Sequence, residues 1–293
     1  MKNFLWIGAL LLLVFIGDRA GGLILQKLAD SSQFRYSRLY RGEAKADMLL
    51  VGNSRGLMFY QPYIEEITGL KTLNISYNAL SIDLAKNLIA DHIRINGAPK
   101  TMILDITMCD RENDQLIAGF QTYRSHSENL DTLLRSRQPK TYYGGEFSHL
   151  FRFNSEIFHR ALYYRNRSDE DWLLDRVIND KMIANLEESD TNDFTIKEYL
   201  FENLIETVEL AQAAGVKVKL VVNPYYPPYR NQRMINMEKT IERVEKATNL
   251  RVFDYSMAVT DLKAFGDYQH LNKYGSRLFI DKMMADEVLS ASY

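Results

Sequence analysis

The sequence has few of the residues that cross-link a chain or break it into short turns. Its 293 residues include one cysteine, which excludes an internal disulfide and any multi-cysteine zinc or iron–sulfur site. Only 6 prolines and 15 glycines occur, which favours long regular elements over a turn-rich all-β fold. A charge excess is also lacking, since 36 basic residues face 38 acidic ones. Nucleic acid is therefore not an expected partner.

The longest apolar run lies at the N-terminus. Residues 4–17 (FLWIGALLLLVFIG) carry no charge, but a bilayer span needs roughly 17–25 residues. Apolar character resumes in residues 20–25, beyond Asp18 and Arg19, so a tilted helix could cross a membrane. We predict an uncleaved membrane anchor in residues 1–30. A cleaved signal peptide and a buried core helix are the alternatives.

The charges around this segment conflict about its orientation. Five basic residues follow it within residues 19–41, and only Lys2 and the terminal amine precede it, so the positive-inside rule favours a cytoplasmic C-terminal side. A short lysine-led start before a leucine-rich run is, in contrast, typical of exported proteins. We favour export. This predicts a single-pass protein of the cytoplasmic membrane, with its main domain on the periplasmic side.

Short apolar runs alternate with helical patterns in the rest of the chain. The runs are rich in Val, Ile and Leu and lie at residues 46–52, 72–75, 100–107, 216–223 and 251–254. Such runs without polar alternation are typical of parallel strands buried on both faces. A helical repeat of apolar residues occurs in residues 81–96, 194–214 and 231–248. Residues 31–293 are therefore predicted to form one α/β domain, a three-layer, doubly wound (flavodoxin-like) fold with five parallel strands.

Residues 111–193 interrupt this alternation. The stretch is too long for a loop between a strand and a helix, and it is rich in aromatic residues and arginine. We predict a mostly helical insertion. It is either a packing cap or a wall of the substrate site, because arginines and aromatic rings suit sugars or anionic polymers.

Three reactive side chains follow predicted strands. Ser54 comes directly after the first strand, and Asp267 and His270 come after the fifth. Because ligands bind at the carboxyl ends of parallel strands, these side chains are expected at one edge of the sheet. Each alone is as readily a turn or capping residue. Together they are the groups that nucleophilic acyl transfer requires.

Two motifs give the sequence a family resemblance. Residues 52–55 (GNSR) resemble the Gly-Asp-Ser block of the SGNH (GDSL-type) hydrolase superfamily, and residues 267–270 (DYQH) match its closing Asp-x-x-His block. The adjoining residues 270–275 (HLNKYG) strengthen the match. A membrane segment before such a domain is similar to bacterial envelope proteins of this superfamily that add or remove acyl groups on surface polymers. The resemblance covers most of residues 46–110 and 194–293.

This resemblance implies a serine esterase or O-acyltransferase that forms an acyl-enzyme on Ser54. His270 would be the general base and Asp267 the carboxylate that orients it, and the short spacing lets the carboxylate reach Nδ1. The implied substrate is an acylated envelope polysaccharide or another ester, with no cofactor. No metal is expected, because the other histidines lack ligand spacing. The alternative is a weakly active or inactive SGNH-fold protein that binds or assembles polysaccharide.

The oxyanion site departs from the family pattern at two positions. Ala79 stands where the family has glycine, and its N–H can serve provided that φ is negative there. Cys109 stands where the family usually has asparagine, and a thiol is a poor donor. The loss of one such donor costs roughly 10²–10³ in rate.

The Ser54 N–H, at the start of the helix after the first strand, is expected to face the oxyanion. The contact missing at Cys109 could be supplied by Asn78, Asn223 or Arg55. Arg55 and Asn223 are also candidate substrate-binding residues. An ion pair between Arg55 and a nearby carboxylate is the alternative for the arginine.

Overall fold

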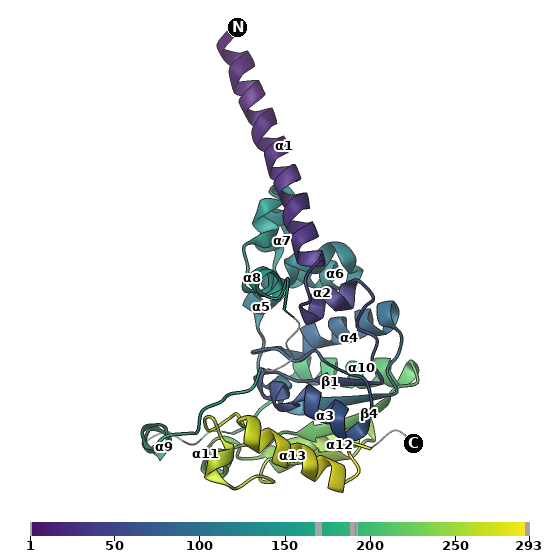
Figure 1. Cartoon of the computed structure of the whole chain (residues 1–293), viewed down its shortest axis with the longest axis vertical. Helices are drawn as coiled ribbons and strands as arrows, with labels where there is room; N and C mark the ends of the chain where they lie inside the picture. The colour runs from purple at the N-terminus through teal and green to yellow at the C-terminus, as the bar shows by residue number, and fades with distance from the viewer. Residues whose placement is uncertain (1, 168–171, 188–190, 192, 291–293) are drawn as a thin grey trace. The chain divides into compact units, whose positions relative to one another are not determined.

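The computed structural model describes residues 2–167, 172–187, 191 and 193–290 (Figure 1). The chain divides into two compact units. The first comprises Met1–Glu43 and Asn113–Asp169, and the second comprises Ala44–Glu112 and Glu170–Tyr293.

Five parallel strands form the sheet of the second unit, in the order β2-β1-β3-β4-β5. The strands are β1 (Met48–Val51), β2 (Thr72–Asn74), β3 (Thr101–Asp105), β4 (Lys217–Val222) and β5 (Val252–Asp254). Each lies inside a predicted apolar run, and β1 is buried along its whole length. The prediction of a doubly wound α/β fold with five parallel strands is confirmed.

Helices cover both faces of this sheet (Figure 1). On one face α4 (Ile82–Asn96) and α10 (Glu198–Ala213) pack against each other, and α10 also packs on β4. On the other face lie α3 (Gln61–Thr68) and α13 (Lys273–Ala285), which share a buried apolar cluster with the strands. The remaining elements of the unit are α9 (Asp180–Glu187), α11 (Pro227–Arg233), α12 (Met237–Thr248) and the 3₁₀ helices η1 (Ser54–Met58), η2 (Ile106–Asp110) and η5 (Leu262–Ala264).

One predicted helix is wrong in its extent. The pattern over residues 231–248 predicts a continuous helix, whereas the structure has α11 and α12 with a break between them. Asn236 lies in the break with φ of 65°, a left-handed conformation that a right-handed helix cannot contain. The apolar repeat continues across the break, so periodicity alone does not detect it.

The direction in which successive strands are added to the sheet reverses at β1. Strand β2 pairs with one edge of β1 and β3 with the other, so the connections that leave β1 and β3 diverge at their carboxyl ends. In doubly wound sheets this point opens a crevice that binds ligands. Ser54 follows β1 directly, so the topology places it at this point.

The first unit is helical in its described part. Its elements are α1 (Lys2–Asp30), α2 (Arg35–Tyr40), α5 (Asp114–Gly119), η3 (Phe120–His126), α6 (Glu128–Arg137), α7 (Pro139–Phe147), η4 (Leu150–Phe153) and α8 (Glu156–Tyr163). The expectation that the insertion is mostly helical is thus confirmed.

Helix α1 is long and apolar enough to cross a membrane by length and composition. Its large apolar side chains between Leu5 and Ile16 are 52–78% exposed, so they have no protein core to pack into. The alternative of a buried core helix therefore does not hold for this segment.

Candidate active site

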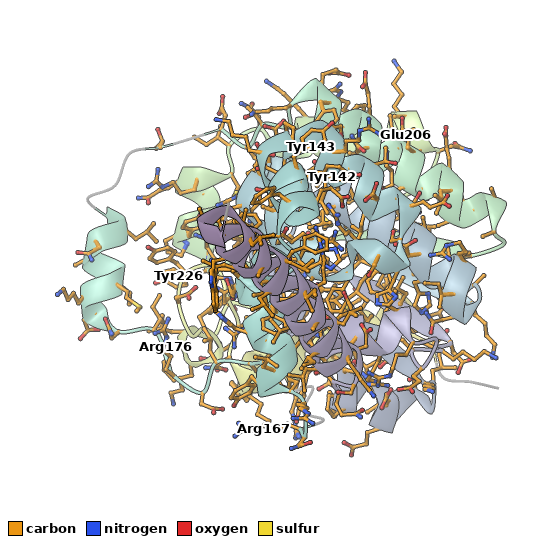
Figure 2. All side chains as sticks on the ribbon, turned by 90° about the horizontal axis from the view of Figure 1, so that it is seen from above. Tyr142, Tyr143, Arg167, Arg176, Glu206 and Tyr226 are labelled. Carbon is orange, nitrogen blue, oxygen red and sulfur yellow. The ribbon has the colours of Figure 1, made fainter. Side chains whose placement is uncertain are left out.

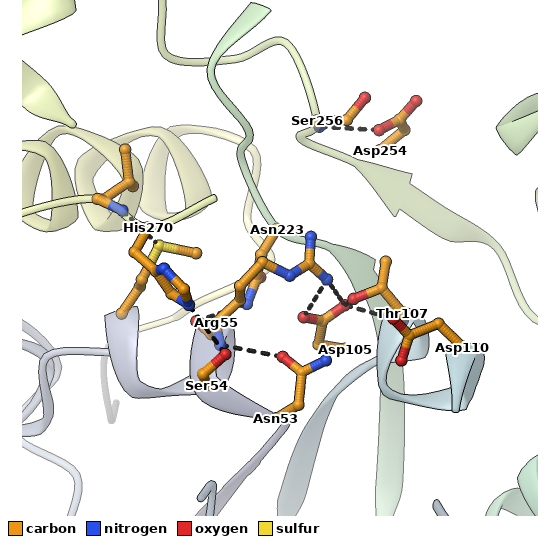
Figure 3. A network of polar contacts seen from close by, with 12 residues as sticks. Asn53, Ser54, Arg55, Asp105, Thr107, Asp110, Asn223, Asp254, Ser256 and His270 are labelled. Atoms are coloured by element: carbon orange, nitrogen blue, oxygen red, sulfur yellow. Dashed lines mark hydrogen bonds and ion pairs between the residues drawn. The ribbon is translucent and has the colours of Figure 1, made fainter. Parts of the chain in front are cut away.

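The structure brings Ser54, His270 and Asp267 into contact, although 216 positions separate the serine from the histidine (Figure 3). His270 Nε2 lies 2.8 Å from Ser54 Oγ. On the other side of the ring, His270 Nδ1 lies 2.9 and 3.0 Å from the two carboxylate oxygens of Asp267. All three belong to the second unit. The contacts form a continuous path for a proton from hydroxyl to imidazole, oriented by a carboxylate.

The turn that presents Ser54 depends on two glycines. A Cβ on Gly52 would lie 2.8 Å from the Cα of Gly56, and a Cβ on Gly56 would collide with Ser76. The side chain of Asn53 accepts a hydrogen bond of 3.0 Å from the Arg55 N–H and so caps η1. Ser54 therefore stands at the first position of a short, tightly packed helix.

Backbone hydrogen bonds fix the carboxylate of Asp267 in its loop. Its Oδ1 accepts the N–H groups of Gln269 and His270, each at 2.9 Å. Burial alone would raise the pKa of Asp267, but the hydrogen bond and charge of His270 and the two backbone N–H groups lower it overall. Arg176 lies 3.6 Å from Oδ2 and adds a further positive charge. The carboxylate is held ionised, as the orienting role requires.

Asn272, two residues after His270, anchors the histidine loop through its side-chain amide. Its Oδ1 accepts the Gly275 N–H at 3.0 Å and so caps α13. Its Nδ2 donates to the carbonyl of Lys263 at 2.7 Å and to that of Arg176 at 3.2 Å. One amide therefore ties the histidine loop to α13, to η5 and to the segment that carries Arg176.

Ser54 lines two cavities of different character. The first, of about 170 Å³, combines polar groups with apolar side chains, which are Leu57, Met58, Trp172, Leu173, Leu174 and Leu271. The second, of about 90 Å³, is more polar and includes Arg55, Arg111 and Tyr229. Residues 172–174 belong to the predicted insertion, so part of it lines this cavity beside Ser54.

Two donors for an oxyanion lie beside Ser54. The Ser54 N–H has no acceptor among the residues that the structure describes, as is usual for the first residue of a helix. Asn78 is exposed and lines the larger cavity together with Ser54. The contribution of a helix dipole is small, because the helix after β1 is a 3₁₀ helix of only five residues.

Ala79 does not meet the condition under which its N–H could serve the oxyanion. Its φ is +53°, in the left-handed region, and not negative. This conformation costs a residue with a Cβ roughly 1–2 kcal/mol and is readily adopted by glycine. Ala79 does line the smaller cavity with Ser54.

Cys109 is not brought to Ser54. The thiol is fully buried in η2, and the residue lines neither of the two cavities beside the serine. Burial and the nearby carboxylates of Asp105 and Asp110 raise its pKa well above the ordinary value. A neutral, buried thiol at this place can only pack.

Arg55 and Asn223 lie beside the serine turn and contact each other there (Figure 3). Arg55 is buried, and its Nη2 lies 3.0 Å from Asp105 Oδ2 while the guanidinium stacks 3.9 Å from the ring centre of Tyr225. Burial would lower the pKa of Arg55, but Asp105 raises it overall. Asn223 is buried and donates from Nδ2 to the Arg55 carbonyl at 3.2 Å. Arg55 lines the smaller of the two cavities beside Ser54, whereas Asn223 lines neither. The ion pair with Asp105 matches the alternative that the sequence left open for Arg55.

Several residues of the site are not identified by the sequence motifs. Asp105, the ion-pair partner of Arg55, is the last residue of β3. A carboxylate at the end of a predicted strand is a sequence signal that could have indicated it. Arg176 and the wall at residues 172–174 lie in a segment without periodicity, so the sequence holds no signal that places them beside His270. Among the described residues, no group of three or more His, Cys, Asp or Glu side chains could hold a metal ion.

Comparisons with known proteins give a distant structural likeness. No protein-family model matches the sequence, and no curated protein matches it. Ten chains of solved structures match, among them a crystal structure from Bacteroides fragilis described as a "putative acylhydrolase". It is 12% identical, the match covers 84% of this chain and 88% of that chain, and the TM-score is 0.40. A likeness of this extent defines no family for the chain.

Proposed function

We propose that this protein is a membrane-anchored serine esterase or O-acyltransferase of the SGNH type. The observation that carries the proposal is the unbroken contact from the Ser54 hydroxyl through the His270 ring to Asp267. A serine hydroxyl is a weak nucleophile until an adjacent base takes its proton. The arrangement supplies the base, and it also supplies the group that orients the base.

In the first half of the proposed reaction, Ser54 Oγ attacks the carbonyl carbon of an ester while His270 Nε2 takes the hydroxyl proton. The positive imidazolium is stabilised by Asp267, whose lowered pKa keeps it ionised. The tetrahedral intermediate collapses, the ester C–O bond breaks, and the leaving alcohol receives the proton from His270. An acyl group remains on Ser54.

In the second half, His270 takes a proton from water or from a sugar hydroxyl, which attacks the acyl-enzyme. Collapse of the second intermediate returns the proton to Ser54 and releases an acid or a new ester. The acceptor decides between hydrolysis and transfer, because the chemistry at Ser54 is the same in both.

The negative charge of each intermediate needs donors. The Ser54 N–H and the side-chain amide of Asn78 are the groups that the proposal assigns to it, since both lie at the larger cavity. The apolar part of that cavity suits the acyl chain. Its volume of about 170 Å³ favours a short chain over a long one.

A carbohydrate ester is the proposed substrate, with the catalytic domain on the periplasmic side of the membrane. Helix α1 supports the anchor, and the resemblance to envelope proteins of the superfamily supports the substrate class. Tyr229 lines the smaller cavity with its ring edge, because its two faces stack on Tyr225 and Tyr268 at centroid distances of 5.7 and 5.2 Å.

The release of p-nitrophenol from p-nitrophenyl acetate by the full chain in detergent tests the proposal. Ser54→Ala is expected to lower kcat/KM by at least about 10³. Ser136→Ala, an exposed serine on α6, is the matched control and should leave the rate unchanged. Equal rates for the wild type and Ser54→Ala would remove the serine from the mechanism.

A second function, polysaccharide binding with weak or no catalysis, is favoured by one specific observation. Cys109 is buried and Ala79 has a left-handed backbone, so two of the expected oxyanion positions depart from an efficient site. This function predicts binding of an acylated polysaccharide with similar affinity by the wild type and Ser54→Ala, and at most slow turnover by the wild type. Rapid turnover by the wild type that Ser54→Ala lacks would exclude it.

A further inference from the structure

The uncharged part of α1 is too short to cross a bilayer by itself. Residues 4–17 form 14 helical positions, which span roughly 21 Å at 1.5 Å per residue. The hydrocarbon core of a bilayer is about 30 Å thick. Several more residues of α1 must therefore lie at membrane depth, and the next two are Asp18 and Arg19.

Both charged side chains are hydrogen-bonded within the first unit. Asp18 accepts hydrogen bonds from the Ser148 hydroxyl at 2.5 Å and from the His149 N–H at 2.8 Å. Arg19 donates to the carbonyls of Glu146 and Phe147 at 3.3 Å. The charges meet the backbone ends of α7 and η4, so neither side chain needs water on that side.

The loop between α7 and η4 packs closely against α1. A Cβ on Gly22 would collide with His149, and a Cβ on Gly21 would lie 2.9 Å from a methyl group of Leu150. The two glycines let the loop approach the helix. The loop therefore lies at the level of α1 where the uncharged run ends.

Large apolar side chains are exposed at this same level. Phe147 is 87% exposed, Tyr143 on α7 is 56% exposed (Figure 2), and Leu23 on α1 is 67% exposed. We define the apolar collar as Leu23, Ile24, Tyr143, Phe147, Leu150 and Phe151. A phenylalanine as exposed as Phe147 is unfavourable in water, so the collar marks an interaction surface.

We propose that the apolar collar inserts into the interfacial layer of the bilayer that α1 enters, and that it completes the membrane contact of a helix too short to span alone. Aromatic side chains are enriched at this depth of membrane proteins. A lipid surface is the occupant that fits, because the collar adjoins the exposed apolar run of α1 and the intervening Asp18 is hydrogen-bonded to the loop. This inference does not depend on any activity at Ser54.

Site-specific fluorescence in nanodiscs of phosphatidylcholine tests the proposal. The full chain with Cys109→Ala and Phe147→Cys is labelled with the fluorophore NBD, and part of the lipid carries a nitroxide. The matched control is Tyr163→Cys, a half-exposed aromatic position on α8. Its neighbour Tyr164 accepts the Gln33 N–H, so Tyr163 lies beyond the C-terminal end of α1, further along the chain direction than the collar and away from the apolar run.

The label at position 147 is expected to emit at shorter wavelength and to be quenched by the nitroxide lipid, whereas the label at position 163 is quenched by aqueous iodide. The same iodide quenching at both positions would overturn the proposal. A blue-shifted label at position 147 that resists both quenchers would also overturn it, because a second copy of the chain would then cover the collar. Substitution of the exposed Phe147 removes no buried contact, so the variant should fold.

Discussion

The residues on the histidine side of Ser54 are held by more hydrogen bonds than those on its oxyanion side. On the histidine side, Asp267 accepts two backbone N–H groups as well as the imidazole, and Asn272 ties the loop to α13. On the oxyanion side, the described donors are one backbone N–H and the exposed side chain of Asn78, beside Ala79 in a left-handed conformation. The groups that activate the Ser54 hydroxyl are therefore preorganised, whereas few donors are available to stabilise the oxyanion. If the proposed function holds, variants on the first side should cost more than variants on the second.

The largest loss is expected for His270→Ala. Removal of the base leaves the Ser54 proton without an acceptor, so kcat/KM should fall by at least about 10³. Hydrolysis of p-nitrophenyl acetate measures it. His159→Ala, on the exposed face of α8, is the control and should retain the wild-type rate. Full activity of His270→Ala would show that His270 is not the base that activates Ser54.

Asp267→Asn should cost somewhat less. An asparagine keeps the shape but cannot stabilise the imidazolium, and it favours the wrong tautomer of His270, so we expect a loss of about 10²–10⁴ in kcat. KM should change little, because the carboxylate lies behind the imidazole ring. A change confined to KM would show that Asp267 binds substrate instead.

Asn78→Ala tests the oxyanion side of Ser54. If its amide holds the oxyanion, kcat should fall by about 10²-fold with little change in KM. Asn154→Ala, an exposed asparagine after η4, is the matched control. An unchanged kcat in Asn78→Ala would leave the backbone N–H of Ser54 as the remaining assigned donor and would make the two sides still more unequal.

Ala79→Gly should stabilise the protein. Glycine removes the steric cost of the left-handed backbone, and its greater freedom when unfolded offsets part of this, so the expected gain is about 1 kcal/mol. Thermal unfolding measures it. Ala90→Gly, inside α4, should instead lose about 0.5–1 kcal/mol. A loss in both variants would mean that the Ala79 methyl group packs favourably.

The smallest effect concerns acid stability. The pKa of Asp267 is lower in the folded protein than its ordinary value, so the ionised carboxylate stabilises the fold above about pH 4. This contribution is lost as the pH falls through the folded pKa. The difference in melting temperature between the wild type and Asp267→Asn should therefore shrink on acidification below about pH 4. A difference independent of pH would contradict the assigned pKa direction.

The sequence predicts well whatever depends on local pattern. The five strands are visible because they lie in short apolar runs without polar alternation, a pattern typical of strands buried on both faces. The pattern is clearest in β1, whose four residues are all apolar and buried. Ser54 and His270 are identifiable because short motifs fix their place relative to the strands. The apolar N-terminal run likewise predicts α1.

The sequence predicts poorly whatever depends on packing between distant segments. The φ of Ala79 follows from how its loop meets the serine turn, and the burial of Cys109 follows from how η2 packs. The wall at residues 172–174 belongs to an aperiodic stretch that is held at the site by contacts with distant segments, among them a bridge between Leu174 and Asn272 and a ring contact between Trp172 and Tyr77. None of these contacts has a local signature.

Covalent labelling of Ser54 tests the central claim most directly. The full chain is treated with a fluorophosphonate, and the modified peptide is identified by mass spectrometry in the wild type and in His270→Ala. The account predicts one adduct, on Ser54, that forms rapidly in the wild type and is nearly absent without His270. Modification of another residue, or equal labelling of Ser54 in both proteins, would contradict it.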